Sequence, residues 1–85
     1  MELRFTQAFN REFKKITRGN VALKKRVIKQ LQILLKNPKH PSLRLHKLEG
    51  IKYWSISISK SIRVLILFAK EAIYIYHIGK HEDVY

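Results

Sequence analysis

The chain has 85 residues, of which 46% are hydrophobic, and it contains no cysteine. This length predicts a single domain spanning residues 1–85, and the lack of cysteine excludes a disulfide scaffold and a cysteine zinc site. Eighteen Lys and Arg against six Asp and Glu give a formal net charge of +12. So basic a small domain favours a polyanionic partner, and nucleic acid fits better than an acidic protein or a membrane surface.

The hydrophobic segments are short. None approaches the roughly 20 residues needed to cross a bilayer, and Arg4, Arg11, Lys14 and Lys15 interrupt the amino-terminal segment. The sequence therefore predicts a soluble protein that lacks a signal peptide and stays in the cytoplasm.

The amino-terminal segment predicts a short strand followed by a helix. The strand is expected over Glu2–Phe5, and the Thr6 hydroxyl can cap the helix after it. Apolar residues then recur at helical spacing until Gly19 ends the helix. These residues are Phe9, Phe13 and Ile16.

A second, longer helix is expected after Asn20, which can act as its cap. Asn37-Pro38 ends it, because proline lacks an amide donor and disfavours helical geometry in the residue before it. Its predicted apolar stripe comprises Leu23, Val27, Ile28, Leu31, Leu34 and Leu35, and its other face carries Lys24, Lys25, Arg26 and Lys29.

The second half of the chain predicts strands. Residues 39–50 form a connection with extended residues around 43–48, and after Gly50 the period changes to two. Residues 62–68 form a hydrophobic central strand, and Lys70-Glu71 makes a turn into a strand over 72–78. The alternating segment before the central strand places Trp54, Ile56 and Ile58 on a buried face and Ser55, Ser57 and Ser59 on an outer face. The expected class is α+β, with an N-terminal strand and a two-helix hairpin packed on one face of a small antiparallel sheet.

Arg63 lies within the predicted central strand. If its even-numbered neighbours face the helices, then Arg63 faces away from them, beside the serine hydroxyls, where a phosphate can reach it. An arginine within a strand needs a partner or exposure. An ion pair with Glu71, Glu82 or Asp83 is the alternative, and the composition leaves the two interpretations even.

Three stretches resemble the RelE/ParE superfamily of toxins, in their order and in their spacing along the whole chain. His46-Lys47-Leu48-Glu49-Gly50 is similar to the segment before the second strand of these toxins, and Ile62-Arg63-Val64-Leu65-Ile66 to their central strand. Gly79-Lys80-His81-Glu82-Asp83-Val84-Tyr85 is similar to their carboxy-terminal signature. The resemblance implies the RelE-like toxin fold.

The resemblance also implies an activity, that of the RelE/YafQ-like mRNA interferases, which cleave mRNA in the ribosomal A site without a metal. By position, Arg63 would stabilise charge on the phosphate, and His81 would be the general acid. His46 would assist the acid–base work, and Tyr85 would stack on a base or position the phosphate. The substrate contacts implied in this way are Lys47, Lys52, Ser57, Lys60 and Lys80. No cofactor is implied, and the spacing of the four histidines fits no usual zinc pattern. His40 is interpreted as a loop residue and His77 as structural.

The implied partners are mRNA, ribosomal RNA of the A site, and an antitoxin with an acidic or amphipathic segment, which together predict a toxin–antitoxin hetero-oligomer. The chain departs from strongly active members at Ser55, Ser57 and Ser59, where these usually carry Lys or Arg. Three alternatives stay open: a ParE-like inhibitor of DNA gyrase that is not an RNase, a catalytically weak homologue that mainly binds its antitoxin, and a generic small RNA-binding module.

Overall fold

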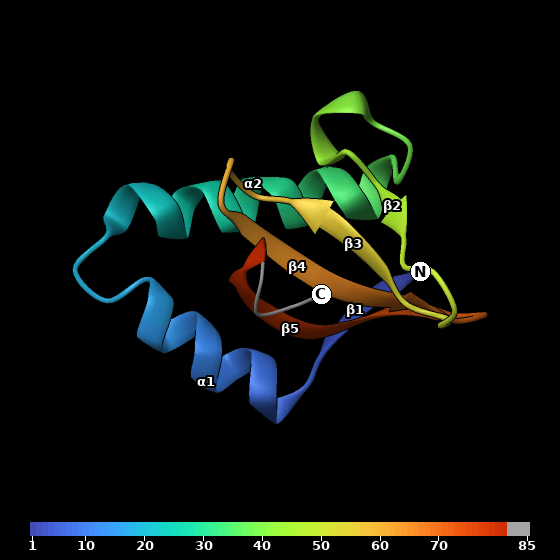
Figure 1. Ribbon diagram of the computed structural model, residues 1–85, viewed down its shortest axis with the longest axis horizontal. Helices are drawn as coiled ribbons and strands as arrows, with labels where there is room; N and C mark the ends of the chain where they lie inside the picture. Colours follow the sequence, from blue (N-terminus) through green and yellow to red (C-terminus); the bar gives the residue numbers. More distant parts are fainter. Residues whose placement is uncertain (82–85) are drawn as a thin grey trace.

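The computed structural model describes residues 1–81 as two helices packed against a five-stranded mixed sheet (Figure 1). The elements are β1 (Glu2–Phe5), α1 (Gln7–Ile16), α2 (Val21–Lys36), the 3-10 turn η1 (Pro41–Leu43), β2 (His46–Lys47), β3 (Trp54–Ser57), β4 (Ile62–Phe68) and β5 (Ala72–Lys80). The strands lie in the order β1-β5-β4-β3-β2. Neighbours are antiparallel except β1 and β5, which run parallel. No helix within residues 1–81 is long and apolar enough to span a membrane.

Both helices begin at the predicted caps. The Thr6 hydroxyl accepts from the Phe9 amide at 3.0 Å and donates to the Tyr76 carbonyl at 2.7 Å, which ties the start of α1 to β5. The Asn20 side chain accepts from the Leu23 amide at 3.0 Å. Each cap satisfies an amide that has no partner within its helix.

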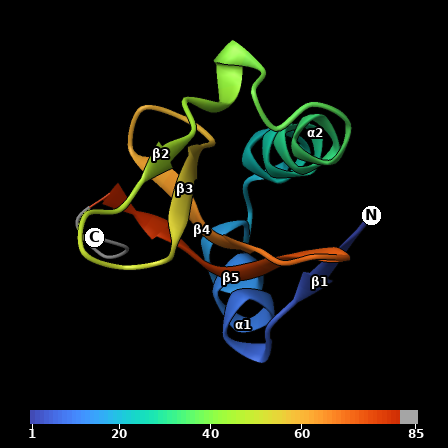
Figure 2. The same cartoon turned by 90° about the vertical axis from the view of Figure 1, so that its right-hand side faces the viewer.

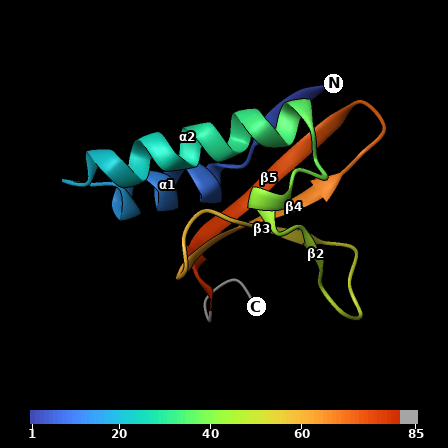
Figure 3. The same cartoon turned by 90° about the horizontal axis from the view of Figure 1, so that it is seen from above.

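A single core forms between the sheet and the helices. On β4, Ile62, Val64 and Ile66 are buried, and they pack with residues of α1 and α2 in one cluster. Seen from above, α1 and α2 lie on the same side of β4 and β5 (Figure 3). The predicted α+β fold, with both helices on one sheet face, is confirmed. The sheet was predicted to be antiparallel, and this is wrong for β1, which pairs in parallel with β5.

The buried face of α2 differs from the predicted stripe. Val27, Leu31 and Leu34 face the core, but Ile28 and Leu35 are 44% and 42% exposed. Each residue turns the helix by about 100°, so these two point away from the sheet. Gln30 takes the buried position instead, and its amide donates to the Ser42 and Ser57 carbonyls.

Strand boundaries also differ from those predicted. β3 ends at Ser57, because the amides of Ile58 and Ser59 both donate to the Ile62 carbonyl and close a tight turn. β5 continues to Lys80, which pairs with Ile62. The extended run expected over 43–48 shortens to the two residues of β2, because Leu43 lies in η1 and Arg44 has a positive φ of 47°.

Candidate functional site

Arg63 lies near the start of β4, the middle strand, on the sheet face that the helices leave open. It pairs with Ser57 of β3 and Gly79 of β5. Its Nε and Nη2 donate to the Ser55 hydroxyl at 3.1 and 3.0 Å, and Nη2 also donates to the Arg44 carbonyl at 3.1 Å. These two acceptors are neutral, and they fix the orientation of the guanidinium. Two of the alternative partners, Glu82 and Asp83, lie outside the described residues.

Ser55 is buried, and the prediction that it lies on an exposed hydroxyl face is wrong. It pairs with His46 of β2 on one side and Leu65 of β4 on the other, and the Arg63 guanidinium bonds to its hydroxyl. Its hydroxyl is therefore a buried acceptor for Arg63. Ser57 and Ser59 are partly buried, and the Ser57 hydroxyl donates to the Ser59 carbonyl at 3.1 Å.

Arg44 adopts a left-handed conformation, which costs a non-glycine residue about 1–2 kcal/mol. Its amide donates to the Pro41 carbonyl, and its own carbonyl accepts from Arg63. Gln30 fastens the same turn to β3 through its bonds to the Ser42 and Ser57 carbonyls. The strained turn thus places an acceptor beside the guanidinium. Sequence reasoning missed Arg44, because nothing local marks it.

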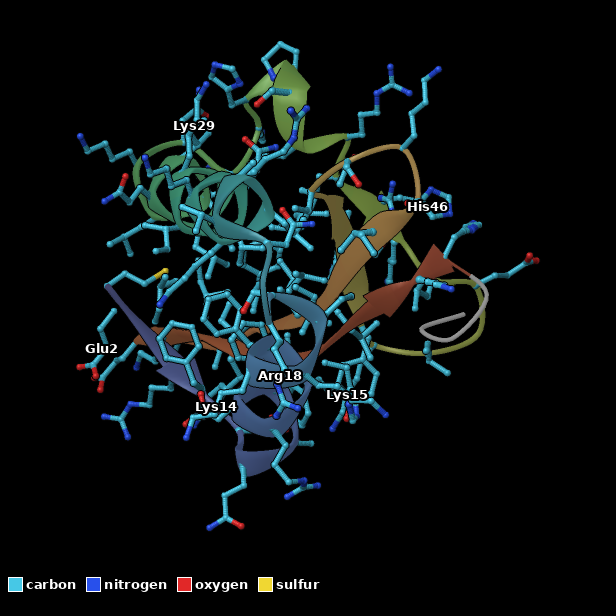
Figure 4. All side chains as sticks on the ribbon, turned by 90° about the vertical axis from the view of Figure 1, so that its left-hand side faces the viewer. Glu2, Lys14, Lys15, Arg18, Lys29 and His46 are labelled. Atoms are coloured by element: carbon cyan, nitrogen blue, oxygen red, sulfur yellow. The ribbon has the colours of Figure 1, made fainter. Side chains whose placement is uncertain are left out.

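The two strand histidines share a row with Ser55. His46 pairs with Ser55, Ser55 with Leu65, and Leu65 with His77, so the four residues share one face of the sheet. β2 lies at one edge of the sheet (Figure 2), and Figure 4 shows the His46 side chain on it. His77 lies at the opposite end of the row, on β5. The register therefore places predicted and unpredicted histidines on the face of Arg63.

The remaining predicted residues are dispersed. His81 directly follows β5, and its amide donates to the Ser61 carbonyl at 2.9 Å. Lys80 pairs with Ile62, whose side chain is buried in the core, and Lys47 lies over the Trp54 ring at 6.0 Å, so neither shares a register row with Arg63. Lys52 is exposed in the loop before β3. Tyr85 lies outside the described residues.

A basic groove of about 830 Å³ opens beside Arg63, between α2, η1 and the β3–β4 turn. The predicted residues Ser57, Lys60 and Arg63 meet there. Within residues 1–81 no acidic side chain lines the groove, and six cationic ones do: Lys25, Arg26, Lys29, Arg44, Lys60 and Arg63. The sequence signal for this surface was the run of cations on the outer face of the second helix. Figure 4 shows Lys29 on α2, away from Lys14 and Lys15 of α1 and from Arg18 in the turn after α1.

Three tyrosines lie close together at the other end of the same sheet. Tyr53 meets Tyr76 edge-on with ring centroids 5.1 Å apart, and Tyr74 lies 6.4 Å from Tyr76. Partial burial and the neighbouring Tyr53 raise the pKa of Tyr76 above its ordinary value. Tyr76 therefore stays a neutral hydroxyl at physiological pH.

This architecture is shared with solved bacterial toxins. A YoeB/ParE toxin from Agrobacterium tumefaciens superimposes with a TM-score of 0.83 at 15% identity, covering 95% of this chain and 99% of that chain. A metal-bound toxin from Helicobacter pylori gives 0.83 at 17% identity, covering 100% and 99%. The match in the Escherichia coli DinJ–YafQ complex gives 0.80 at 10% identity, covering 98% and 96%. At these identities the likeness establishes the fold, that of a small α+β toxin.

The sequence itself identifies the family. Residues 3–85 match the family described as ParE toxin of type II toxin-antitoxin system, parDE, and the chain belongs to it. The predicted membership of the RelE/ParE superfamily is confirmed. No curated protein is similar enough in sequence to count as a relative. Within residues 1–81, no group of three or more His, Cys, Asp or Glu is placed to hold a metal ion.

The contact between Ser55 and Arg63 leads to a prediction about the stability of the fold. Ser55→Ala removes the acceptor of two guanidinium bonds and leaves part-buried donors unpaired, so we expect a loss of about 1–3 kcal/mol in the free energy of unfolding. Urea denaturation measures it. Ser61→Ala, at an exposed serine before β4, is the matched control and should change stability by less than about 0.5 kcal/mol. Equal stabilities of the two variants would show that Ser55 does not hold Arg63.

Proposed function

We propose that this toxin is an endoribonuclease that cleaves mRNA in the A site of the ribosome and so stops translation. The observation that carries the proposal is Arg63, a cation that the Ser55 hydroxyl and the Arg44 carbonyl orient on an open sheet face, beside a groove lined by further cations. A phosphodiester fits this site, since a fixed guanidinium stabilises the charge that develops on its oxygens.

The reaction needs two proton transfers beside that cation. The ribose 2′-oxygen loses its proton and attacks phosphorus, while the 5′-oxygen leaves and gains a proton. His81 follows the strand residue Gly79, which pairs with Arg63, and it supplies the proton to the 5′-oxygen. His46, in the row beside Arg63, assists the acid–base work. Tyr85, which lies outside the described residues, is assigned to base stacking by resemblance alone.

The groove extends the site for a polyanion. Its side chains from α2, η1 and the β3–β4 turn neutralise phosphates and fix the strand that runs away from Arg63. The cations of both helices give ribosomal RNA a second place to bind. Base identity is read elsewhere, since phosphate contacts position an RNA without selecting its sequence.

An antitoxin completes the proposed system. The structures with a similar fold include the DinJ–YafQ complex and the Staphylococcus aureus YoeB–YefM complex. An acidic segment of the antitoxin lies in the groove and covers Arg63, because the six cations there repel one another until an anion binds.

Cleavage is the direct test. In a purified translation system, with cuts mapped by primer extension, the wild type is expected to cut mRNA only at the ribosomal A site. Arg63→Ala and His81→Ala should each lower the rate about 100-fold or more, because each removes a group that acts in the transition state. Arg4→Ala is the matched control, since Arg4 is exposed on β1 and pairs with Glu2.

Other outcomes separate the alternatives. Growth arrest with uncut transcripts would refute the enzyme proposal and favour gyrase inhibition, which DNA supercoiling assays measure. Neither arrest nor cleavage would leave a homologue that mainly binds its antitoxin.

The groove predicts a salt dependence. Lys29→Ala removes one phosphate contact, so the slope of log affinity for a short single-stranded RNA against log salt concentration should fall by about 0.7. Fluorescence anisotropy at several salt concentrations measures the slope. Lys70→Ala, at the exposed β4–β5 turn, should keep the wild-type slope. Equal slopes for all three proteins would place the RNA elsewhere.

Binding of the antitoxin should raise the stability of the toxin. A partner that binds only the folded toxin, at a concentration 100 times its dissociation constant, stabilises it by about 2.7 kcal/mol. The melting temperature of the toxin, measured with the product of the neighbouring gene, should rise accordingly, and by less for Arg63→Ala. A constant melting temperature at saturating partner would argue against the pairing.

A further inference from the structure

His77 is paired with a carboxylate that lies far away in sequence. Its Nδ1 is 3.2 and 3.1 Å from the two carboxylate oxygens of Glu12 on α1. The Ile78 amide donates to the same carboxylate at 3.1 Å. Both side chains are partly exposed, His77 to 43% and Glu12 to 39%. The pair is thus anchored in the fold and open to a ligand.

The end of β1 explains why Glu12 lies there. β1 pairs with β5 only as far as Ile75, so the β5 amides beyond that point have no strand partner on this edge. The Glu12 carboxylate supplies the acceptor that Ile78 needs. Because an ionised carboxylate only accepts, Nδ1 of His77 carries the proton, and Nε2 keeps its lone pair in the neutral ring.

A cavity of about 700 Å³ lies at this edge. Glu12, Lys15, His77 and Lys80 are the charged or titratable groups that line it, together with Leu65 and Gly79. This cavity is lined by Gly79, which pairs with Arg63 from β5, whereas the basic groove is lined by Ser57, which pairs with Arg63 from β3. The cavity and the groove therefore lie on opposite sides of Arg63. Two lysines at its rim favour an anionic ligand.

The register sets His77 close to Arg63. His77 comes two residues before Gly79, so it is the diagonal neighbour of Arg63, at about 7–8 Å between side-chain origins. His81 comes two residues after Gly79. In sequence, the two histidines therefore stand on either side of the β5 residue that pairs with Arg63.

We propose that His77, oriented by Glu12, is the general base of the cleavage reaction, a role that rests on the proposed function. Nε2 takes the proton from the ribose 2′-OH, and the 2′-oxygen forms its bond to phosphorus. The bond from phosphorus to the 5′-oxygen breaks, and His81 protonates that oxygen. The products are a 2′,3′-cyclic phosphate and a 5′-hydroxyl, and no metal, oxidant or further reactant is consumed.

Several charged groups face His77. Glu12 approaches it from α1, Lys15 comes from the same helix, Lys80 from β5, and Arg63 lies on the diagonal across β4. A base acts only in its unprotonated form. The cleavage rate should therefore rise with pH on the acidic side of its profile.

Single-turnover cleavage of ribosome-bound mRNA, measured between pH 5 and 9, tests the role. His77→Gln should lower the rate about 100-fold and remove the rise on the acidic side of the profile. His77→Ala should regain activity when free imidazole is added, which compares one variant with itself and so is insensitive to lost stability. Glu12→Gln should lose less than His77→Gln, and Glu71→Gln, at the exposed β4–β5 turn, should match the wild type.

The inference and the proposed function fail in different ways. A wild type that cuts and a His77→Gln variant with the wild-type profile would overturn the inference alone. A slower His77→Gln variant that keeps the acidic rise, with no rescue of His77→Ala by imidazole, would show a structural role and also overturn it. A wild type that cuts no ribosome-bound transcript would overturn the proposed function.

Discussion

The pairing of β4 with its neighbours determines which residues reach the core and which reach the open face. Val64 and Ile66 are fully buried and Ile62 nearly so, while Arg63 between them is held on the other side. Because side chains alternate with a period of two, a slip by one residue would bury the guanidinium and expose the three aliphatic chains. Burial of those chains is worth about 1.5–3 kcal/mol each. The core therefore fixes the position of Arg63, and the site is a consequence of the register.

Neutral acceptors suit the anion-binding role proposed for Arg63. A carboxylate beside Arg63 would satisfy its donors but would also offset its charge. The Ser55 hydroxyl and the Arg44 carbonyl satisfy guanidinium donors without bringing a negative charge of their own. The Arg44 carbonyl reaches Arg63 because Arg44 adopts a left-handed backbone conformation, which is unfavourable for a residue with a side chain. The turn that supports the site therefore offsets part of the stability gained in the core. The serine that departs from the basic pattern of the family is the residue that positions the arginine.

Local signals in the sequence predicted most of the fold. Thr6, Asn20 and Asn37-Pro38 mark helix ends by chemistry confined to a few residues, and the alternation after Gly50 gives the strands and the orientation of Arg63. Contacts between distant residues escaped prediction. Ser55 is buried by β2 and by Arg63, and Gln30 replaces an apolar neighbour in the core because two distant carbonyls need a donor. The site residues were chosen by resemblance, and the structure shows only where they lie.

The role proposed for the pair of Glu12 and His77 could not be predicted from the sequence. The two residues are separated by 65 positions, and they meet only because β1 ends where α1 passes the exposed edge of β5. The Glu12 carboxylate accepts from the Ile78 amide at this edge and also bonds to the His77 ring. The group that satisfies the edge amide therefore also determines which ring nitrogen of His77 carries the proton. In a displacement at phosphorus the entering and leaving oxygens lie on opposite sides of the atom. In the proposed reaction, the groups that move the two protons therefore flank Arg63. In sequence, His77 and His81 stand two residues before and two residues after Gly79, the β5 residue that pairs with Arg63.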